Sequence, residues 1–151
     1  MNDQGIKSIG ESLAHTSKGL FKTADILKLE YKILLWTSIL ISICTLTFEM
    51  NETTSKCLGI VSIAAAIWLL VGENSQHKVM QYMSLGNDFL NLYNEVERSY
   101  HDGLALSNDI HDTRAKLNEM TNEISISWLA KKWVDKTIKK EMNLKWVSGV
   151  K

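Results

Sequence analysis

The fold is decided by residues 33–72, which read ILLWTSILISICTLTFEMNETTSKCLGIVSIAAAIWLLVG. Two apolar runs of 16 residues, Ile33–Phe48 and Cys57–Gly72, flank the polar loop Glu49–Lys56, and neither run contains an acidic, basic or histidine residue. A helix that crosses a bilayer usually needs about 17–25 apolar residues. Flanking side chains with polar ends extend the runs to the interface: Tyr31, Lys32 and Lys56. We therefore predict a transmembrane hairpin, with a buried hairpin in a soluble helical bundle as the alternative.

The rest of the chain predicts helices and no strands. Its 151 residues include no proline, and apolar residues recur at helical spacing on both sides of the hairpin. Gly10 and Gly19 interrupt the first pattern, which therefore predicts one helix or two short ones. The predicted fold class is all-α, a two-helix transmembrane hairpin with long cytoplasmic amphipathic helices. The predicted regions are an amphipathic N-terminal helix (1–32), the hairpin (33–72, spans 33–48 and 57–72), a cytoplasmic helical region (73–127) and a basic, tryptophan-rich C-terminal helix (128–151).

Short polar segments predict where some helices begin and end. Thr53 or Thr54 is the expected N-cap of the second span. Asp102-Gly103 predicts a break, and a final helix is expected to begin near Ser125 or Ser127.

Lysine residues predict the orientation of the hairpin. They flank the runs unequally: Lys18, Lys22, Lys28 and Lys32 precede the first run, Lys78 follows the second, and only Lys56 lies in the loop. Because positive charge is retained on the cytoplasmic side, this distribution places both termini in the cytoplasm.

Two groups of small and hydroxyl-bearing residues are the candidates for function within the hairpin. One helix face of the first run carries hydroxyl groups, with a carboxylate at its exit: Ser38, Ser42, Thr45 and Glu49. A small-residue face of the second run allows close helix approach: Gly59, Ser62 and Ala66. In one interpretation both faces only pack the hairpin together. In the other, several hairpins assemble, the hydroxyl groups line a pore and Glu49 forms a ring at its mouth.

A heptad-type apolar face follows the hairpin and predicts a helix–helix contact. Its members follow a 3-4-3-4 spacing: Tyr82, Leu85, Phe89, Leu92 and Val96. The face is expected either to join copies of the chain or to pack against the amphipathic N-terminal helix.

The C-terminal segment predicts a basic, amphipathic surface. Residues 86–127 carry eight acidic and three basic residues, whereas residues 128–151 carry seven lysines and two acidic residues. The candidate contact residues are Trp128, Lys131, Lys132, Trp133, Lys136, Lys139, Lys140 and Trp146. Such a helix docks on a partner or on the chain itself, rests on anionic lipid, or contacts nucleic acid phosphates; the order is our order of preference.

Residues that suggest catalysis are scarce. The sequence has no glycine-rich phosphate loop, no cysteine pair at zinc spacing and no HExxH motif, so we expect neither an enzyme nor a cofactor. Cys44 and Cys57 are expected to be free, with a disulfide as the alternative if their end of the hairpin meets an oxidising compartment.

The topology resembles the SLATT domains, the SMODS- and SLOG-associating two-transmembrane effectors of bacterial conflict systems. The resemblance covers about residues 19–100 and rests on three segments: FKTADILKLEYKILLWTSILISICTLTF, CLGIVSIAAAIWLLVG and QYMSLGNDFLNLYNEVERSY. It implies an effector that disrupts or permeates the inner membrane when a partner signals phage infection. The implied partners are cyclic-oligonucleotide synthases or, in one branch, retron reverse transcriptases with their RNA and DNA. The resemblance provides no catalytic residue, and the basic C-terminal helix lies outside it.

We therefore expect a multi-pass protein of the bacterial inner membrane that oligomerises and disrupts or permeates the bilayer when a regulator from the same operon triggers it. The expected partners are lipid, further copies of the chain and that cytoplasmic regulator. The alternative is a membrane-anchored adaptor that recruits a soluble partner without permeation. A phage holin is a third possibility, against which the long heptad helix argues.

Overall fold

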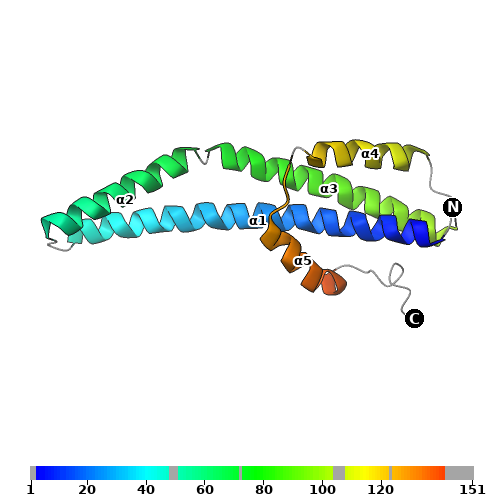
Figure 1. The fold of residues 1–151 in the computed structure, drawn as a ribbon, viewed down its shortest axis with the longest axis horizontal. Helices are drawn as coiled ribbons and strands as arrows, with labels where there is room; N and C mark the ends of the chain where they lie inside the picture. The colour runs from blue at the N-terminus through cyan, green and yellow to red at the C-terminus, as the bar shows by residue number, and fades with distance from the viewer. Residues whose placement is uncertain (1–2, 48–50, 72, 104–107, 123, 142–151) are drawn as a thin grey trace. The chain divides into compact units, whose positions relative to one another are not determined.

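A computed structural model describes residues 3–47, 51–71, 73–103, 108–122 and 124–141. Over these ranges the chain is all-helical, with five α-helices and no strand (Figure 1). The helices are α1 (Asp3–Thr47), α2 (Glu52–Val71), α3 (Glu73–His101), α4 (Asn108–Asn122) and α5 (Trp128–Glu141). The prediction of an all-α chain is therefore confirmed for the described residues.

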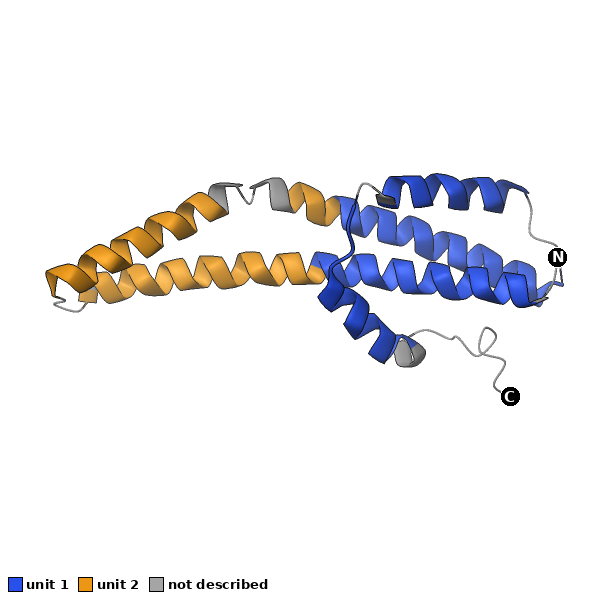
Figure 2. Cartoon of the chain, viewed as in Figure 1, with its two compact units in different colours: residues 1–24, 81–151 blue, residues 25–80 orange. Residues whose placement is uncertain are grey.

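The chain divides into two compact units (Figure 2). We call residues 1–24 together with 81–151 the bundle. From here on, 'the hairpin' means residues 25–80, which include the predicted transmembrane hairpin 33–72 and the residues on either side of it. Within the ranges that the structure describes, no helix combines the length and the apolar content needed to cross a membrane. The last residues of the two predicted spans, Phe48 and Gly72, lie outside those ranges.

The N-terminal segment is one helix, because α1 continues through Gly10 and Gly19 without a break. The alternative of two short helices is therefore wrong. A glycine inside a helix costs about 1 kcal/mol relative to alanine, and tertiary contacts offset this cost. At Gly19 a Cβ atom would lie 3.2 Å from Cγ2 of Ile126. The missing side chain thus allows the segment before α5 to approach α1 closely.

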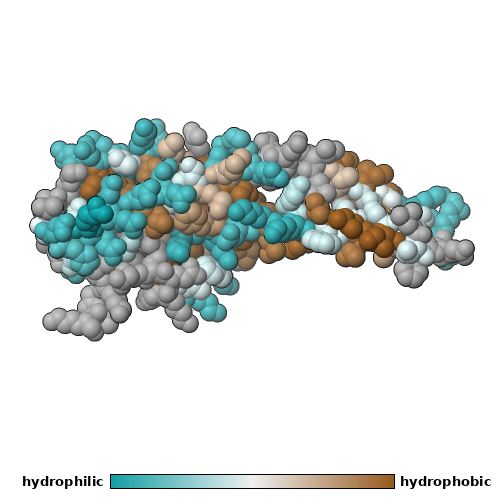
Figure 3. Space-filling model, turned by 180° about the vertical axis from the view of Figure 1, so that it is seen from behind, coloured by the Kyte–Doolittle hydropathy of each residue, from teal (hydrophilic) through white to brown (hydrophobic). Residues whose placement is uncertain are grey.

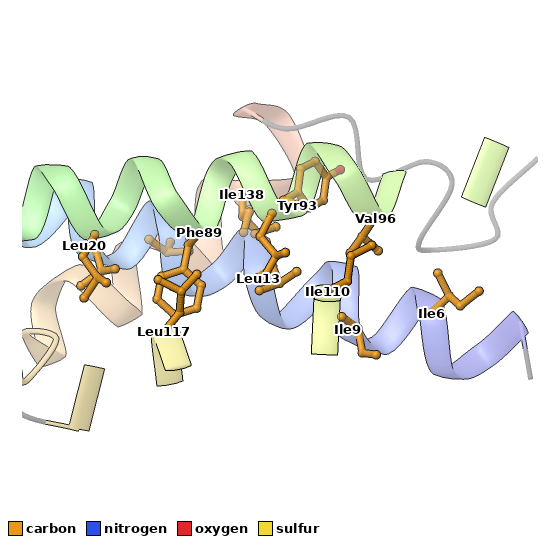
Figure 4. Close-up of a cluster of buried hydrophobic side chains, with 14 residues drawn as sticks. Ile6, Ile9, Leu13, Leu20, Phe89, Tyr93, Val96, Ile110, Leu117 and Ile138 are labelled. Carbon is orange, nitrogen blue, oxygen red and sulfur yellow. The ribbon is translucent and has the colours of Figure 1, made fainter. Parts of the chain in front are cut away.

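The core of the bundle lies where α1, α3, α4 and α5 meet (Figure 4). Apolar residues of α1 at helical spacing face the α3 side chains, since Leu13, Leu20 and Phe89 are all almost fully buried. Ile110 and Leu117 of α4, and Val134 and Ile138 of α5, complete the cluster. The amphipathic patterns of four helices therefore bury one common core.

Two of the three helix boundaries predicted from the sequence are confirmed. α3 ends at His101, and Gly103 follows with a φ angle of +67°, which favours glycine. α5 begins at Trp128, directly after Ser127, whose carbonyl accepts a hydrogen bond from the Lys131 amide. The predicted cap of the second span is wrong: α2 begins at Glu52, so Asn51 precedes it rather than Thr53 or Thr54. Asparagine is the stronger N-cap, because its short side chain satisfies the first helical amides better.

Candidate functional site

The hairpin exposes most of its apolar side chains. Among the described residues, twelve of the sixteen exposed large hydrophobic side chains belong to the hairpin, whereas Val79 is its one buried apolar residue. Hydrophobic surface accordingly gathers over the hairpin at the right of Figure 3. Examples from α1 and α2 are Ile33, Trp36, Leu40, Ile60, Ile63 and Trp68. Soluble monomers rarely expose an apolar patch of more than a few hundred Å². A surface of this kind marks a site of contact with lipid or with another protein.

The hydroxyl groups of the first run bond to the backbone of their own helix. Ser38 Oγ donates to the Leu34 carbonyl at 3.0 Å, and Ser42 Oγ donates to the Ser38 carbonyl at 2.9 Å. Thr45 Oγ1 donates to the Ser42 carbonyl at 2.9 Å. Each hydroxyl proton is thus satisfied without water, while the oxygen keeps accepting capacity. Ser42 and Thr45 are exposed and Ser38 is half-buried; Glu49 lies outside the described residues.

The small-residue face of α2 makes no close contact at its glycine. A Cβ atom added at Gly59 would meet nothing within 4 Å. Ser62 is half-buried and Ala66 is exposed. Within one chain, therefore, this glycine does not bring two helix backbones together.

The heptad face of α3 lies inside the bundle. Leu85, Phe89, Leu92 and Val96 are buried in the core cluster together with α1 residues, and Tyr82 packs at its edge. Of the two expected contacts, the structure thus contains the packing against the N-terminal helix. Contact between copies through this face stays a prediction.

The C-terminal helix α5 docks on the bundle through its apolar side. Ala130, Val134 and Ile138 are buried, whereas the basic side chains that the structure describes, Lys131, Lys132 and Lys136, are exposed. Trp128 is also exposed. The side chains of Lys139 and Lys140, and all of Trp146, lie outside the described residues. The helix thus binds its own chain on one face and presents lysines on the other.

Polar contacts hold the start of α5 against α1 and α3. The Ser127 amide donates to Thr23 Oγ1 at 3.2 Å, and the Tyr82 hydroxyl donates to the Ser125 carbonyl at 2.9 Å. Trp133 lies beneath the Lys22 ammonium group, with Nζ 4.0 Å from the ring centroid. His15 and Asp135 approach to 3.4 Å at the exposed rim. Trp133, predicted as a membrane or partner contact, therefore contacts α1.

A family model described as SMODS and SLOG-associating 2TM effector domain 6 matches residues 5–147. The chain belongs to this family. No match to a curated protein or to a solved structure was found. The SLATT match extends beyond residues 19–100, on which the resemblance rested, and includes α5. The C-terminal helix is therefore part of the SLATT domain, and the view that it lies outside is wrong.

The family description establishes a coarse role for the chain. A SLATT domain is an effector domain that associates with partner modules of defence systems. Membership of the retron branch stays a prediction. Cys44 and Cys57 of this SLATT chain are free, so the disulfide alternative is not realised in the structure.

The contacts of Thr23 and Ser125 in this SLATT domain were missed from the sequence. Thr23 and Ser127 are 104 positions apart, and Tyr82 and Ser125 are 43 apart. A serine or threonine at a helix face is common, and its long-range partner leaves no local pattern. The one available signal was the polar segment before the expected start of the last helix.

Replacing Tyr82 by phenylalanine is expected to lower the free energy of unfolding by about 1 kcal/mol, because the bond to the Ser125 carbonyl is lost. Burial raises the pKa of the Tyr82 phenol above its usual value of 10.0, and the Ser125 side chain partly opposes this. The folded chain therefore holds this proton more tightly than the unfolded chain. Its stability should fall as pH rises above about 10. Urea denaturation at pH 8 and pH 10.5 checks both effects. A pH-induced loss as large in Tyr82→Phe as in the wild type would contradict the assignment.

Proposed function

We propose that this SLATT protein is a membrane-embedded effector of a bacterial anti-phage system that oligomerises and permeates the inner membrane when triggered. The observation that carries the proposal is the exposed apolar surface of the hairpin, in which Val79 is the one buried apolar residue among those that the structure describes. Lipid is the cover that this surface fits best, since neither apolar run contains a charged residue. The family description, which includes two transmembrane helices, supports the same placement.

The proposed topology has residues 33–48 and 57–72 in the hydrocarbon and both termini in the cytoplasm. Lysines before the first run and after the second support this orientation. The bundle then lies on the cytoplasmic side, where a regulator from the same operon can reach it. That regulator is a reverse transcriptase with its RNA and DNA or a cyclic-nucleotide system. The proposal assigns no catalysis to the chain.

The proposed pore joins several copies of the hairpin. Gly59 is open within one chain, so a helix of a second copy can approach α2 closely there. Ser42 and Thr45 are exposed on α1 and carry oxygens that can still accept hydrogen bonds from water. Together these features support a path lined by hydroxyl groups, with Glu49 at its mouth.

The test is membrane potential during induced expression with the operon's trigger. We expect the wild type to depolarise the cells, followed with a potential-sensitive dye. Ser42→Leu should slow depolarisation by about tenfold, because it replaces a hydroxyl that faces water in the proposed path by a larger apolar side chain that narrows and dewets the path. Glu49→Ala should change ion selectivity, since a carboxylate ring favours cations.

Ile43→Leu is the matched control, because it changes the neighbouring residue, which is exposed and apolar, without altering its polarity or size. It should depolarise cells like the wild type. Carbonate extraction first verifies that each variant resides in the membrane. Cells that die at intact potential would contradict permeation.

An adaptor role is the second candidate, and the exposed lysines of α5 favour it. A membrane-anchored adaptor would use this surface to hold a partner and would need the hairpin only as an anchor. Exchanging both runs for an unrelated transmembrane hairpin separates the two functions. An adaptor keeps its activity after the exchange, whereas the proposed pore loses it.

A further inference from the structure

A groove of about 310 Å³ opens within the hairpin. α1 contributes Lys28, Tyr31 and Lys32 to its lining, and α3 contributes Val79 and Met80. Positions i, i+3 and i+4 of a helix share one face, so the two lysines and the phenol lie along the same side of α1. The groove therefore has a cationic wall and an apolar wall.

The chemistry of the lining fits an amphiphile with an anionic head. Lys32 is exposed at the lining and brings a positive charge to it. Val79 is buried at the apolar wall, and Met80 is 64% exposed at the rim. Such a site attracts a phosphate at one side and accepts hydrocarbon at the other.

The position of the groove in the sequence indicates which amphiphile can reach it. Lys32 directly precedes the run Ile33–Phe48, and Gln76, also in the lining, follows the end of the second run at Gly72 by four residues. This step rests on the proposed function: with both runs in the hydrocarbon, the groove lies at the headgroup level of the cytoplasmic leaflet. Phospholipid headgroups occupy that level.

We propose that this groove binds the headgroup of an anionic phospholipid, with Lys32 facing its phosphate. Ligand pockets usually measure about 300–1,000 Å³, so a groove of this size accepts a headgroup but not two acyl chains. The acyl chains then follow the exposed apolar surface of α1, which includes Ile33 and Trp36. An anionic lipid in this position would hold the base of the hairpin at a fixed depth.

Lipid selectivity in nanodiscs tests the proposal. The full-length chain is reconstituted in phosphatidylcholine nanodiscs that contain spin-labelled phosphatidylglycerol or, separately, spin-labelled phosphatidylcholine. Electron paramagnetic resonance gives the ratio of the two lipids bound to the protein. Lys32→Gln should lower the preference for phosphatidylglycerol about fivefold, the factor that corresponds to about 1 kcal/mol per lysine at an anionic surface.

Lys78→Gln is the matched control, because it removes one exposed lysine next to the second run and outside the groove lining. It should change the preference by less than about twofold, since Lys78 does not line the groove that holds the proposed headgroup. Equal losses in both variants would overturn the site in favour of diffuse surface charge. An unchanged preference in Lys32→Gln would also overturn it.

Failure of the proposed function is recognised separately. A chain that does not incorporate into nanodiscs contradicts the membrane placement and the lipid site together. A chain that incorporates and binds phosphatidylglycerol at Lys32, but does not depolarise cells, contradicts permeation alone. Circular dichroism of each variant verifies that the helices are retained.

Discussion

Phe89→Ala is expected to lower the free energy of unfolding by about 3–5 kcal/mol, the usual cost of removing a buried aromatic side chain. Phe89 is 1% exposed and lies among Leu13, Leu20 and Leu117 in the core of the bundle. Helices α1, α3 and α4 all contribute to its surroundings, so they cannot collapse into the cavity without moving one another. Urea denaturation of the full-length chain in detergent micelles, followed by far-UV circular dichroism, measures the loss.

Trp128→Ala is the control, because it removes a larger aromatic side chain that is 68% exposed. Its effect should stay within about 0.5 kcal/mol.

The same experiment separates the two roles of the α3 face. If Phe89 also joins copies of the chain, the loss will depend on protein concentration, because association stabilises by mass action. A loss of less than 1 kcal/mol at every concentration would contradict the core assignment.

The positions of the core were predictable because helical periodicity is a local property. Leu85, Phe89, Leu92 and Val96 recur at 4-3-4 spacing, and all four are buried. The break before Gly103 was predictable for the same reason, since a left-handed backbone needs a residue without a side chain.

The contacts that fix α5 were not predictable, because they depend on residues far apart in the sequence. Gly19 reads as a helix breaker until Ile126 is found against it. Trp133 was predicted to contact a partner, its own chain or the membrane surface, and only the structure shows Lys22 above its ring. In each case a tertiary contact with a residue about 100 positions away in the sequence, rather than the local preference of the residue, determines the structure.

For the hairpin, by contrast, the apolar runs are evident in the sequence. A single chain does not contain the molecules that surround them. Ile60 and Trp68 are among the most exposed side chains described. A periodic helix reveals which face it buries, but a helix that is apolar all round does not reveal whether lipid or protein covers it.

Val134→Asp is expected to detach α5 from the bundle. Val134 is 2% exposed in the core cluster, and no basic partner is available to a carboxylate there among the residues that the structure places in that cluster. An uncompensated buried charge costs about 3–5 kcal/mol. The contacts of Thr23 and Tyr82 before the helix are neutral hydrogen bonds and cannot offset that cost. The helix should therefore open while the α1–α3 core remains folded.

Limited trypsin digestion measures the opening, because α5 carries exposed lysines at positions 131, 132 and 136 that a docked helix protects from cleavage. Cleavage in Val134→Asp should be about 100-fold faster than in the wild type, as expected when local opening becomes easier by about 3 kcal/mol. Leu129→Asp is the matched control, since it adds the same carboxylate to the same helix at a site that is 49% exposed. Its charge lies in the first turn, where the helix dipole favours it, so cleavage should remain within a few-fold of the wild type. Equal cleavage of Val134→Asp and Leu129→Asp would show that α5 is not held by its buried face.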